Sequence, residues 1–326
     1  MKFAILGAGA LGSIMAAHLL RAGHDVQVIA RGSRAAYLKE HGITITGLSG
    51  FNIPCPVVTD PKLIEPTDVL VIAVKTYDME AALAGVANIA VGSVLSVQNG
   101  MMKDGQISQV FGRERTLGAA TVTSGELLPN GVVRFTLNEC LYIGELSGEK
   151  TQRVDEVADV LVKAGIGAQA SDNIVSIEWS KFVPWVAGVA LSTLTRLETH
   201  KFLSDPDHAY LMARLVREVA SIPEKLGIAL EDIPPIPVKT MCAAPFDKAV
   251  EQIQAMGRHF ESVAPTHKIS TLQDLEHGRR MEVEETLGFA LGEAQKLGVP
   301  RPTLETCYRL LAGINRFAGS SSSSAS

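Results

Sequence analysis

The chain begins with a short apolar segment that leads directly into three glycines, Gly7, Gly9 and Gly12. A Gly-x-Gly-x-x-Gly spacing between a strand and a helix is typical of folds that bind a dinucleotide. The first glycine permits a tight turn, the second lets the backbone approach a pyrophosphate, and the third lets the helix pack closely on the sheet. The helix that begins with Ala10 and Leu11 presents its N-terminus to the phosphates. The context fits, because an amphipathic segment and a second apolar strand follow.

Two arginines stand at the end of this second strand, where many such chains carry an acidic residue. An Asp or Glu about 20 residues after the glycines would bind a ribose 2′-hydroxyl, whereas an Arg suits a 2′-phosphate. Arg31 and Arg34 occupy this place, so NADP(H) is favoured over NAD(H). The alternative is that they are solvated side chains that happen to follow a strand.

Composition narrows the class of protein. The 326 residues are 46% hydrophobic and 20% charged, as in an ordinary globular chain. A net charge of −5 without a basic run argues against a nucleic-acid surface, and no stretch of about 18 uninterrupted apolar residues predicts a membrane span. The four cysteines form no Cys-x-x-Cys pair and the histidines show no metal-ligand spacing, so we expect a cytoplasmic protein without a metal.

The first half of the chain alternates apolar strands with amphipathic helices, which predicts a parallel sheet covered on both faces. The expected strands are 3–6, 25–30, 69–74, 93–97 and 116–120, and the expected helices are 10–21, 34–40, 79–87 and 103–111. Two hairpins are also predicted, one within 43–58 and one pairing 132–136 with 140–144 after a turn at 129–131.

From about Asn173 the pattern changes to helical periodicity and strand signals vanish, which predicts an all-α second domain. The expected helices are 174–196, 207–226, 246–255, 282–297 and 303–317. The predicted fold class is therefore α/β, with an N-terminal Rossmann-type doubly wound parallel sheet and a C-terminal all-α domain. The predicted domains are 1–172 and 173–318, followed by a flexible Ser-rich tail over 319–326.

Five polar residues are candidates for chemistry, and each also has a structural explanation. Lys75 and Asn99 follow predicted strands, where ligands of open α/β sheets bind, but they also fit a solvated lysine and an Asn-Gly turn. Lys181 lies among bulky apolar residues. These can remove part of its hydration and so suit it to acid–base catalysis, or the methylene stem of Lys181 can simply cover apolar surface. Ser270 also fits a capping box with the glutamine three residues on, and Glu282 also fits a solvated first helical turn.

The order of these motifs, from the glycine triplet through Asn99-Gly100 to Lys181, Ser270-x-x-x-Asp274 and Glu282, resembles the ketopantoate reductase (2-dehydropantoate 2-reductase) family. The resemblance extends from Met1 to about Arg316.

The resemblance implies a role for each of these residues. Lys181 would be the general acid that protonates a ketone oxygen as hydride arrives, and Glu282 would hold polar groups of the substrate and cofactor near it. Ser270 would contact the substrate carboxylate, and Lys75 and Asn99 would line the junction of cofactor and substrate. The family often forms dimers, so a homodimer is an open expectation.

The chain departs from the family pattern after Lys181. The usual asparagines four and eight residues later are Trp185 and Val189 here, and Leu287 replaces a third. Trp185 therefore lies in the expected substrate-binding region and reshapes it. A site that has lost hydrogen-bond partners for a substrate hydroxyl should have a relaxed or redirected preference.

Ser270 and Glu282 also set a geometric condition. A straight helix joining them would separate them by roughly 18 Å, too far for one small substrate. If both serve one site, the chain must break between them, and His277-Gly278 is the expected place.

The leading functional hypothesis is an NADPH-dependent reductase of a 2-oxo acid, with 2-dehydropantoate and pantothenate biosynthesis as the family's example. A related hydroxy-acid or opine-like dehydrogenase is the alternative within enzymes. A non-catalytic NADP(H)-binding sensor is the alternative outside enzymes. Lys181 together with Glu282 favours an enzyme.

Overall fold

A computed structural model describes residues 1–318, and the predicted Ser-rich tail over 319–326 lies outside the described residues. The chain divides into two compact units, Met1–Glu178 and Trp179–Ser326. This division falls inside a helix, α6 (Ile174–Thr195), whereas the sequence places the boundary just ahead of that helix. The two units are described separately below.

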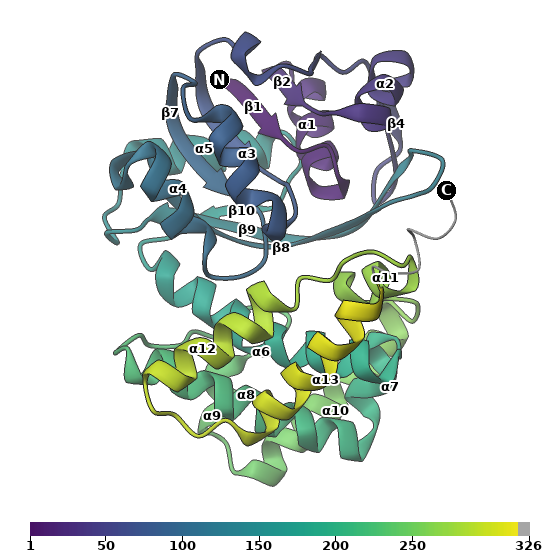
Figure 1. Ribbon diagram of the computed structural model, residues 1–326, viewed down its shortest axis with the longest axis vertical. Coiled ribbons are helices and arrows are strands. Elements are labelled where there is room, and N and C mark those ends of the chain that lie inside the picture. The colour runs from purple at the N-terminus through teal and green to yellow at the C-terminus, as the bar shows by residue number, and fades with distance from the viewer. Residues whose placement is uncertain (319–326) are drawn as a thin grey trace. The chain divides into compact units, whose positions relative to one another are not determined.

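A five-stranded parallel sheet forms the centre of the N-terminal unit, as the α/β alternation predicts (Figure 1). Its strand order is β5-β2-β1-β6-β7, and every neighbouring pair is parallel. The strands are β1 (Lys2–Leu6), β2 (Asp25–Ile29), β5 (Val57–Val58), β6 (Thr67–Ile72) and β7 (Val91–Ser96). Because all five run in one direction, their carboxyl ends meet at a single edge of the sheet.

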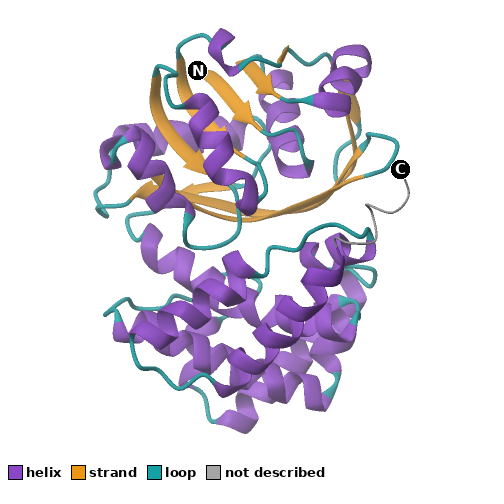
Figure 2. Ribbon diagram, in the orientation of Figure 1, coloured by secondary structure: helices purple, strands orange, loops and turns teal. Residues whose placement is uncertain are grey.

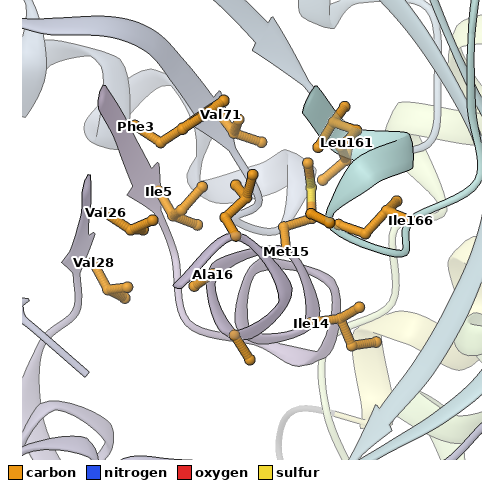
Figure 3. Packing of buried hydrophobic residues seen from close by; sticks show 14 of the residues in the cluster. Phe3, Ile5, Ile14, Met15, Ala16, Val26, Val28, Val71, Leu161 and Ile166 are labelled. Atoms are coloured by element: carbon orange, nitrogen blue, oxygen red, sulfur yellow. The ribbon is translucent and has the colours of Figure 1, made fainter. Parts of the chain in front are cut away.

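Alternate residues of β1 bury against opposite layers, because strand side chains point to opposite faces. Phe3 and Ile5 join a core with α1 (Ala10–Arg21), α2 (Gly32–His41) and α5 (Gln152–Lys163), whereas Ala4 and Leu6 join α3 (Met79–Val86) and α4 (Lys103–Phe111). Figure 3 shows the first core, in which α1 lies among side chains from β1, β2 and the α5 region. The predicted covering of both faces is confirmed. Three short 3₁₀ helices, η1 (Pro61–Leu63), η2 (Thr76–Asp78) and η3 (Arg113–Arg115), complete the connections.

A second sheet lies beneath α1, and it corrects two predictions. Its order is β10-β9-β3-β4, with β8 paired to β9. The strands are β3 (Ile43–Gly47), β4 (Phe51–Ile53), β8 (Leu117–Leu127), β9 (Val133–Glu145) and β10 (Ala168–Ala170). The hairpin expected within 43–58 is confirmed by the antiparallel pair β3–β4. The strand expected over 116–120 is the start of β8, which touches the parallel sheet only through a bridge from Thr116 to Val94.

The hairpin expected to pair 132–136 with 140–144 is wrong, because these residues form one continuous strand, β9. The turn at 129–131 exists but connects β8 to β9, which pair antiparallel. Within this strand, Asn138 hydrogen-bonds the segment that leads into β10. Its side-chain amide donates to the Gly165 carbonyl at 3.1 Å and its oxygen accepts from the Gly167 amide at 2.9 Å.

The described part of the C-terminal unit is helical, as predicted, and Figure 2 shows the ordered strands confined to the N-terminal unit. Its helices are the remainder of α6, then α7 (Thr199–Ser204), α8 (Pro206–Lys225), α9 (Val238–Ala243), α10 (Phe246–Val263), α11 (Ser270–Glu276), the π-helix η4 (Glu284–Gly288), α12 (Phe289–Lys296) and α13 (Pro302–Ala318). The sequence did not predict α7, α9 and α11, which are too short for a clear helical period.

Helix α6 is long and apolar enough to cross a membrane by length and composition alone. Its apolar stretch is interrupted by Glu178 and Lys181, and 78% of its 18-residue window is buried inside the protein. A mostly buried helix of this kind is what the core of a globular unit contains, so α6 is weak evidence for a membrane span.

Candidate active site

The N-terminal unit brings its predicted cofactor residues to one edge of the parallel sheet. Arg31 follows β2, the glycine turn follows β1, Lys75 follows β6 and Asn99 follows β7, and these four strands are neighbours in the sheet. Lys75 and Asn99 are half-buried and Arg31 is exposed. This is the edge at which open α/β sheets bind ligands.

The three glycines meet different surroundings. Gly7 has φ +105°, a conformation that favours glycine, and its amide donates to the Ile29 carbonyl at 3.1 Å. A Cβ on buried Gly12 would lie 2.0 Å from the Gly7 carbonyl oxygen. A Cβ on Gly9 would meet nothing within 4 Å. Gly7 and Gly12 are therefore required by the fold, whereas Gly9 leaves open space at the N-cap of α1.

This open space is what a bound dinucleotide requires. The first turn of α1, which includes Ala10 and Leu11, is half-buried, and its backbone amides face this end of the helix. Amides at a helix N-terminus bind phosphate, and glycine allows close approach of the backbone. The residues present therefore fit the pyrophosphate of a nicotinamide dinucleotide.

The two arginines after β2 have different surroundings, which corrects the prediction that they form one phosphate site. Arg31 is the exposed N-cap of α2. Arg34 is half-buried and donates to the Ala8 carbonyl, the Gly131 carbonyl and the Ser13 hydroxyl at 2.9, 2.8 and 3.0 Å. The Arg34 guanidinium is therefore already hydrogen-bonded within the protein.

Gln98 is a residue of this edge that sequence reasoning missed. It is buried, and its side-chain amide donates to the Val74 carbonyl at 2.7 Å. Val74 precedes Lys75 and Gln98 precedes Asn99, so this bond ties together the two loops that carry the candidate residues. The only available signal was a polar residue at the end of an apolar strand.

A buried lysine–glutamate contact next to the Asn99-Gly100 turn was also missed. Lys103 begins α4, and its Nζ lies 2.5 Å from Glu178 Oε1 and 3.4 Å from the Gly100 carbonyl. Glu178 also accepts from the Ala119 amide at 3.0 Å, which holds the first turns of α6 against β8. Nothing in the sequence pairs two residues 75 positions apart.

Burial raises the pKa of Glu178 to about 8, an effect that Lys103 opposes and the nearby Asp104 reinforces. Burial also lowers the pKa of Lys103, but the charges of Asp104 and Glu178 outweigh burial and raise it overall.

In the C-terminal unit, Lys181 and Trp185 lie one turn apart on α6. The Lys181 ammonium lies 5.5 Å from the centre of the Trp185 ring, within the range of a cation–π contact. The buried Trp185 Nε1 has no hydrogen-bond partner within residues 1–318, and Val189 is fully buried. The α6 positions one and two turns after Lys181 therefore hold an indole and a buried valine.

Ser270 and Glu282 occupy opposite sides of a chain break. Helix α11 ends at Glu276, and Gly278 has φ +65°, so the break predicted at His277-Gly278 is confirmed. Ser270 is the first residue of α11 and does not cap it, which excludes the capping-box explanation. Its buried Oγ has no hydrogen-bond partner in the described part of the chain.

Glu282 is 7% exposed, so it does not belong to a solvated helical turn. It lies just before η4, a π-helical turn of a kind often found at functional sites. Asn315 of α13 holds the preceding residue, since its side chain accepts from the Met281 amide at 2.9 Å and donates to the Met281 carbonyl at 3.3 Å. Asn315 is a further residue that the sequence did not single out.

Comparison with known proteins places these features in a family. The family model described as ketopantoate reductase PanE/ApbA matches residues 3–148, and the model of its C-terminal part matches residues 173–315. The 2-dehydropantoate 2-reductase of Pyrococcus abyssi is 29% identical over 321 residues, covering 98% of this chain and 99% of that protein. That of Archaeoglobus fulgidus is 28% identical, covering 95% and 96%.

Solved structures share the fold over nearly the whole chain. A PanE/ApbA family ketopantoate reductase from Ralstonia eutropha JMP134 superposes with a TM-score of 0.82 at 24% identity, covering 98% of this chain and 99% of that one. A D-mandelate dehydrogenase with NADH and anilino(oxo)acetate gives 0.85 at 20% identity, with the same coverage.

The fold and these relatives define a nicotinamide-dependent oxidoreductase acting on CH–OH groups. The chain belongs to the ketopantoate reductase family, as its motifs predict.

Proposed function

We propose that this protein is an NADPH-dependent reductase that converts a 2-oxo acid into the 2-hydroxy acid. The observation that carries the proposal is Lys181, a half-buried ammonium held against an aromatic ring in a chain of this family. The open space at Gly9 and the exposed Arg31 support the choice of cofactor. An Arg after the second strand suits a 2′-phosphate.

The nicotinamide cofactor, when bound, supplies the hydride. Gly7, Gly9, Gly12 and the first turn of α1 would hold its pyrophosphate, Arg31 its 2′-phosphate, and Lys75 and Asn99 its nicotinamide half. Hydride addition to a ketone places negative charge on the oxygen, and Lys181 would stabilise that charge and donate a proton from Nζ.

Two residues of the C-terminal unit would hold the substrate. The Ser270 hydroxyl, which has no hydrogen-bond partner among residues 1–318, would donate to the substrate carboxylate. The buried Glu282 would accept hydrogen bonds from substrate and cofactor hydroxyls and keep them near Lys181.

Trp185 and Val189 stand where the family pattern has asparagines, so they favour a 2-oxo acid with an apolar side chain over ketopantoate, whose hydroxyl would lose those hydrogen-bond partners. Of these two side chains only the indole N–H can donate a hydrogen bond, and neither offers an acceptor. The chemistry fits a cytoplasmic enzyme working on a small molecule, either alone or as a homodimer.

Oxidation of NADPH across a panel of 2-oxo acids tests this function. The panel should include ketopantoate and acids with aliphatic and aromatic side chains, with Lys181→Ala as the control. We expect turnover of at least one acid, and a loss of kcat of about 10²–10⁴ in Lys181→Ala without a change in NADPH affinity. Tight NADPH binding with no turnover of any acid would instead indicate a sensor.

A further inference from the structure

Arg34 joins three separate segments of the N-terminal unit. From α2 it donates through Nε to the Ala8 carbonyl, through Nη2 to the Ser13 hydroxyl, and through Nη1 to the Gly131 carbonyl. Ala8 lies inside the glycine turn, Ser13 lies in α1, and Gly131 lies in the turn between β8 and β9. Each nitrogen of the guanidinium therefore has a partner in the protein.

The contact with Ala8 determines how the glycine turn presents its backbone. The Ala8 carbonyl accepts from Arg34 and also from the Ser13 hydroxyl, at 3.1 Å. In a trans peptide the carbonyl and the next N–H point in opposite directions. Fixing the Ala8 carbonyl therefore fixes the Gly9 amide on the opposite side of the peptide, at the residue where a Cβ would meet open space.

The contact with Gly131 extends this support to the second sheet. Gly131 has φ +84°, and a Cβ there would lie 2.4 Å from Cζ of Tyr37. Tyr37 follows Arg34 by one turn of α2, and the Arg34 guanidinium carbon lies 5.3 Å from the centre of the Tyr37 ring. The β8–β9 turn is thus held by the Arg34 side chain, which also supports the glycine turn, and it packs closely against Tyr37.

We infer that Arg34 is a positioning residue that fixes the dinucleotide-binding turn and couples it to the β8–β9 turn. Discrimination between NADPH and NADH then falls to Arg31. This inference rests on the proposed cofactor, and it predicts that the two arginines affect binding differently. Arg34 sets affinity for any dinucleotide, whereas Arg31 responds only to the 2′-phosphate.

The test measures dissociation constants for NADPH and NADH by fluorescence titration in Arg34→Lys and in the matched control Arg31→Lys. Lysine keeps the charge but cannot span three separate acceptors. We expect Arg34→Lys to weaken binding of both dinucleotides about equally, by about tenfold or more, as expected for lost hydrogen bonds from a charged donor. We expect Arg31→Lys to change only NADPH binding.

A second readout uses the protein without cofactor. Amide hydrogen exchange over residues 7–13 and 128–132 should accelerate together in Arg34→Lys and remain unchanged in Arg31→Lys. If Arg34→Lys does not fold, Ser13→Ala and Gly131→Ala disturb the same network from its other ends. Each should then weaken both dinucleotides by a similar factor.

The outcomes separate the two proposals. A loss confined to NADPH in Arg34→Lys would make Arg34 a phosphate ligand and overturn the inference. Unchanged affinity, or unchanged exchange at 128–132, would also overturn it. If Arg34→Lys weakens both dinucleotides but wild type binds NADPH no better than NADH, the positioning role stands and the proposed cofactor preference fails.

Discussion

Gly9 and Gly12 belong to one motif, yet alanine at each position should affect a different property of the protein. At Gly12 the added Cβ would lie 2.0 Å from the Gly7 carbonyl oxygen and 3.0 Å from the Ala73 Cβ. At Gly9 the added Cβ would meet nothing within 4 Å. The first substitution should therefore damage the fold, and the second should damage only the binding of the dinucleotide.

The magnitudes follow from the contacts. Relieving a 2.0 Å contact at Gly12 requires a shift of about 1.5 Å against a constrained turn, and such overpacking costs about 1–3 kcal/mol or more. The gain in helix propensity, about 1 kcal/mol, offsets only part of this cost. We expect a net loss of about 2 kcal/mol, or about 4–8 °C in the melting temperature of the N-terminal unit.

At Gly9 the backbone, with φ −70° and ψ −162°, is open to alanine. Reduced freedom of the unfolded chain stabilises by about 0.4–1 kcal/mol, and the poorer N-cap costs a similar amount. Stability should therefore stay nearly constant. NADPH affinity should fall at least tenfold, because a methyl group would stand where the pyrophosphate meets the backbone.

Thermal unfolding and NADPH titration of both variants check this, with Gly105→Ala as the control. Gly105 lies in α4, and its Cβ would also meet open space, so its variant should keep NADPH affinity and gain up to about 1 kcal/mol of stability from helix propensity. Full NADPH affinity in Gly9→Ala, or a wild-type melting temperature in Gly12→Ala, would refute the reasoning.

Three further predictions concern the remaining site residues. Trp185→Asn should raise kcat/KM for ketopantoate relative to 2-oxo acids with apolar side chains by about tenfold, measured by NADPH oxidation; an unchanged ratio would show that Trp185 does not set specificity. The pKa of Glu178 is about 8 in the folded chain against an ordinary 4.5, so the folded state holds this proton more tightly than the unfolded state. The stability that this proton contributes is therefore complete below pH 4.5 and is lost as pH rises through 8. Denaturant titrations from pH 5 to 9 should show this fall in the wild type and a weaker one in Glu178→Gln, and parallel curves would contradict it. Asn315→Ala should destabilise the C-terminal unit by about 1–3 kcal/mol and raise the KM for the 2-oxo acid without changing NADPH affinity, whereas an unchanged KM would separate Asn315 from Glu282.

Local patterns in the sequence predicted most of the fold. The glycine turn, the buried parallel strands, most of the long helices and the break at His277-Gly278 all depend on residues close together in the chain, whereas α5 was not predicted. The β8–β9 ribbon was missed because its pairing depends on the register between two strands. The continuity of β9 is also supported by Asn138, whose side-chain partners lie 27 and 29 residues away. Polar residues inside a strand suggest a turn unless the partner is known.

The candidate site likewise contains residues that the sequence could single out and supporting contacts that it could not. Residue types near Gly9 and Lys181 indicate their chemistry, so the sequence alone could single them out. The supporting contacts could not be predicted, because Arg34 bonds to a carbonyl 97 residues away and Lys103 to a carboxylate 75 residues away. Arg34 was taken for a phosphate ligand because its type and position suit one, and only its partners show that it is occupied.

The bond from Gln98 to the Val74 carbonyl has a consequence for the thermodynamics of binding. It links the segments after β6 and β7, which would otherwise be two independent loops. The two linked segments lose conformational entropy when the chain folds. A ligand that met Lys75 and Asn99 would therefore have less ordering to impose on them. Cutting that bond would make association more costly in entropy and leave every group that touches the ligand in place.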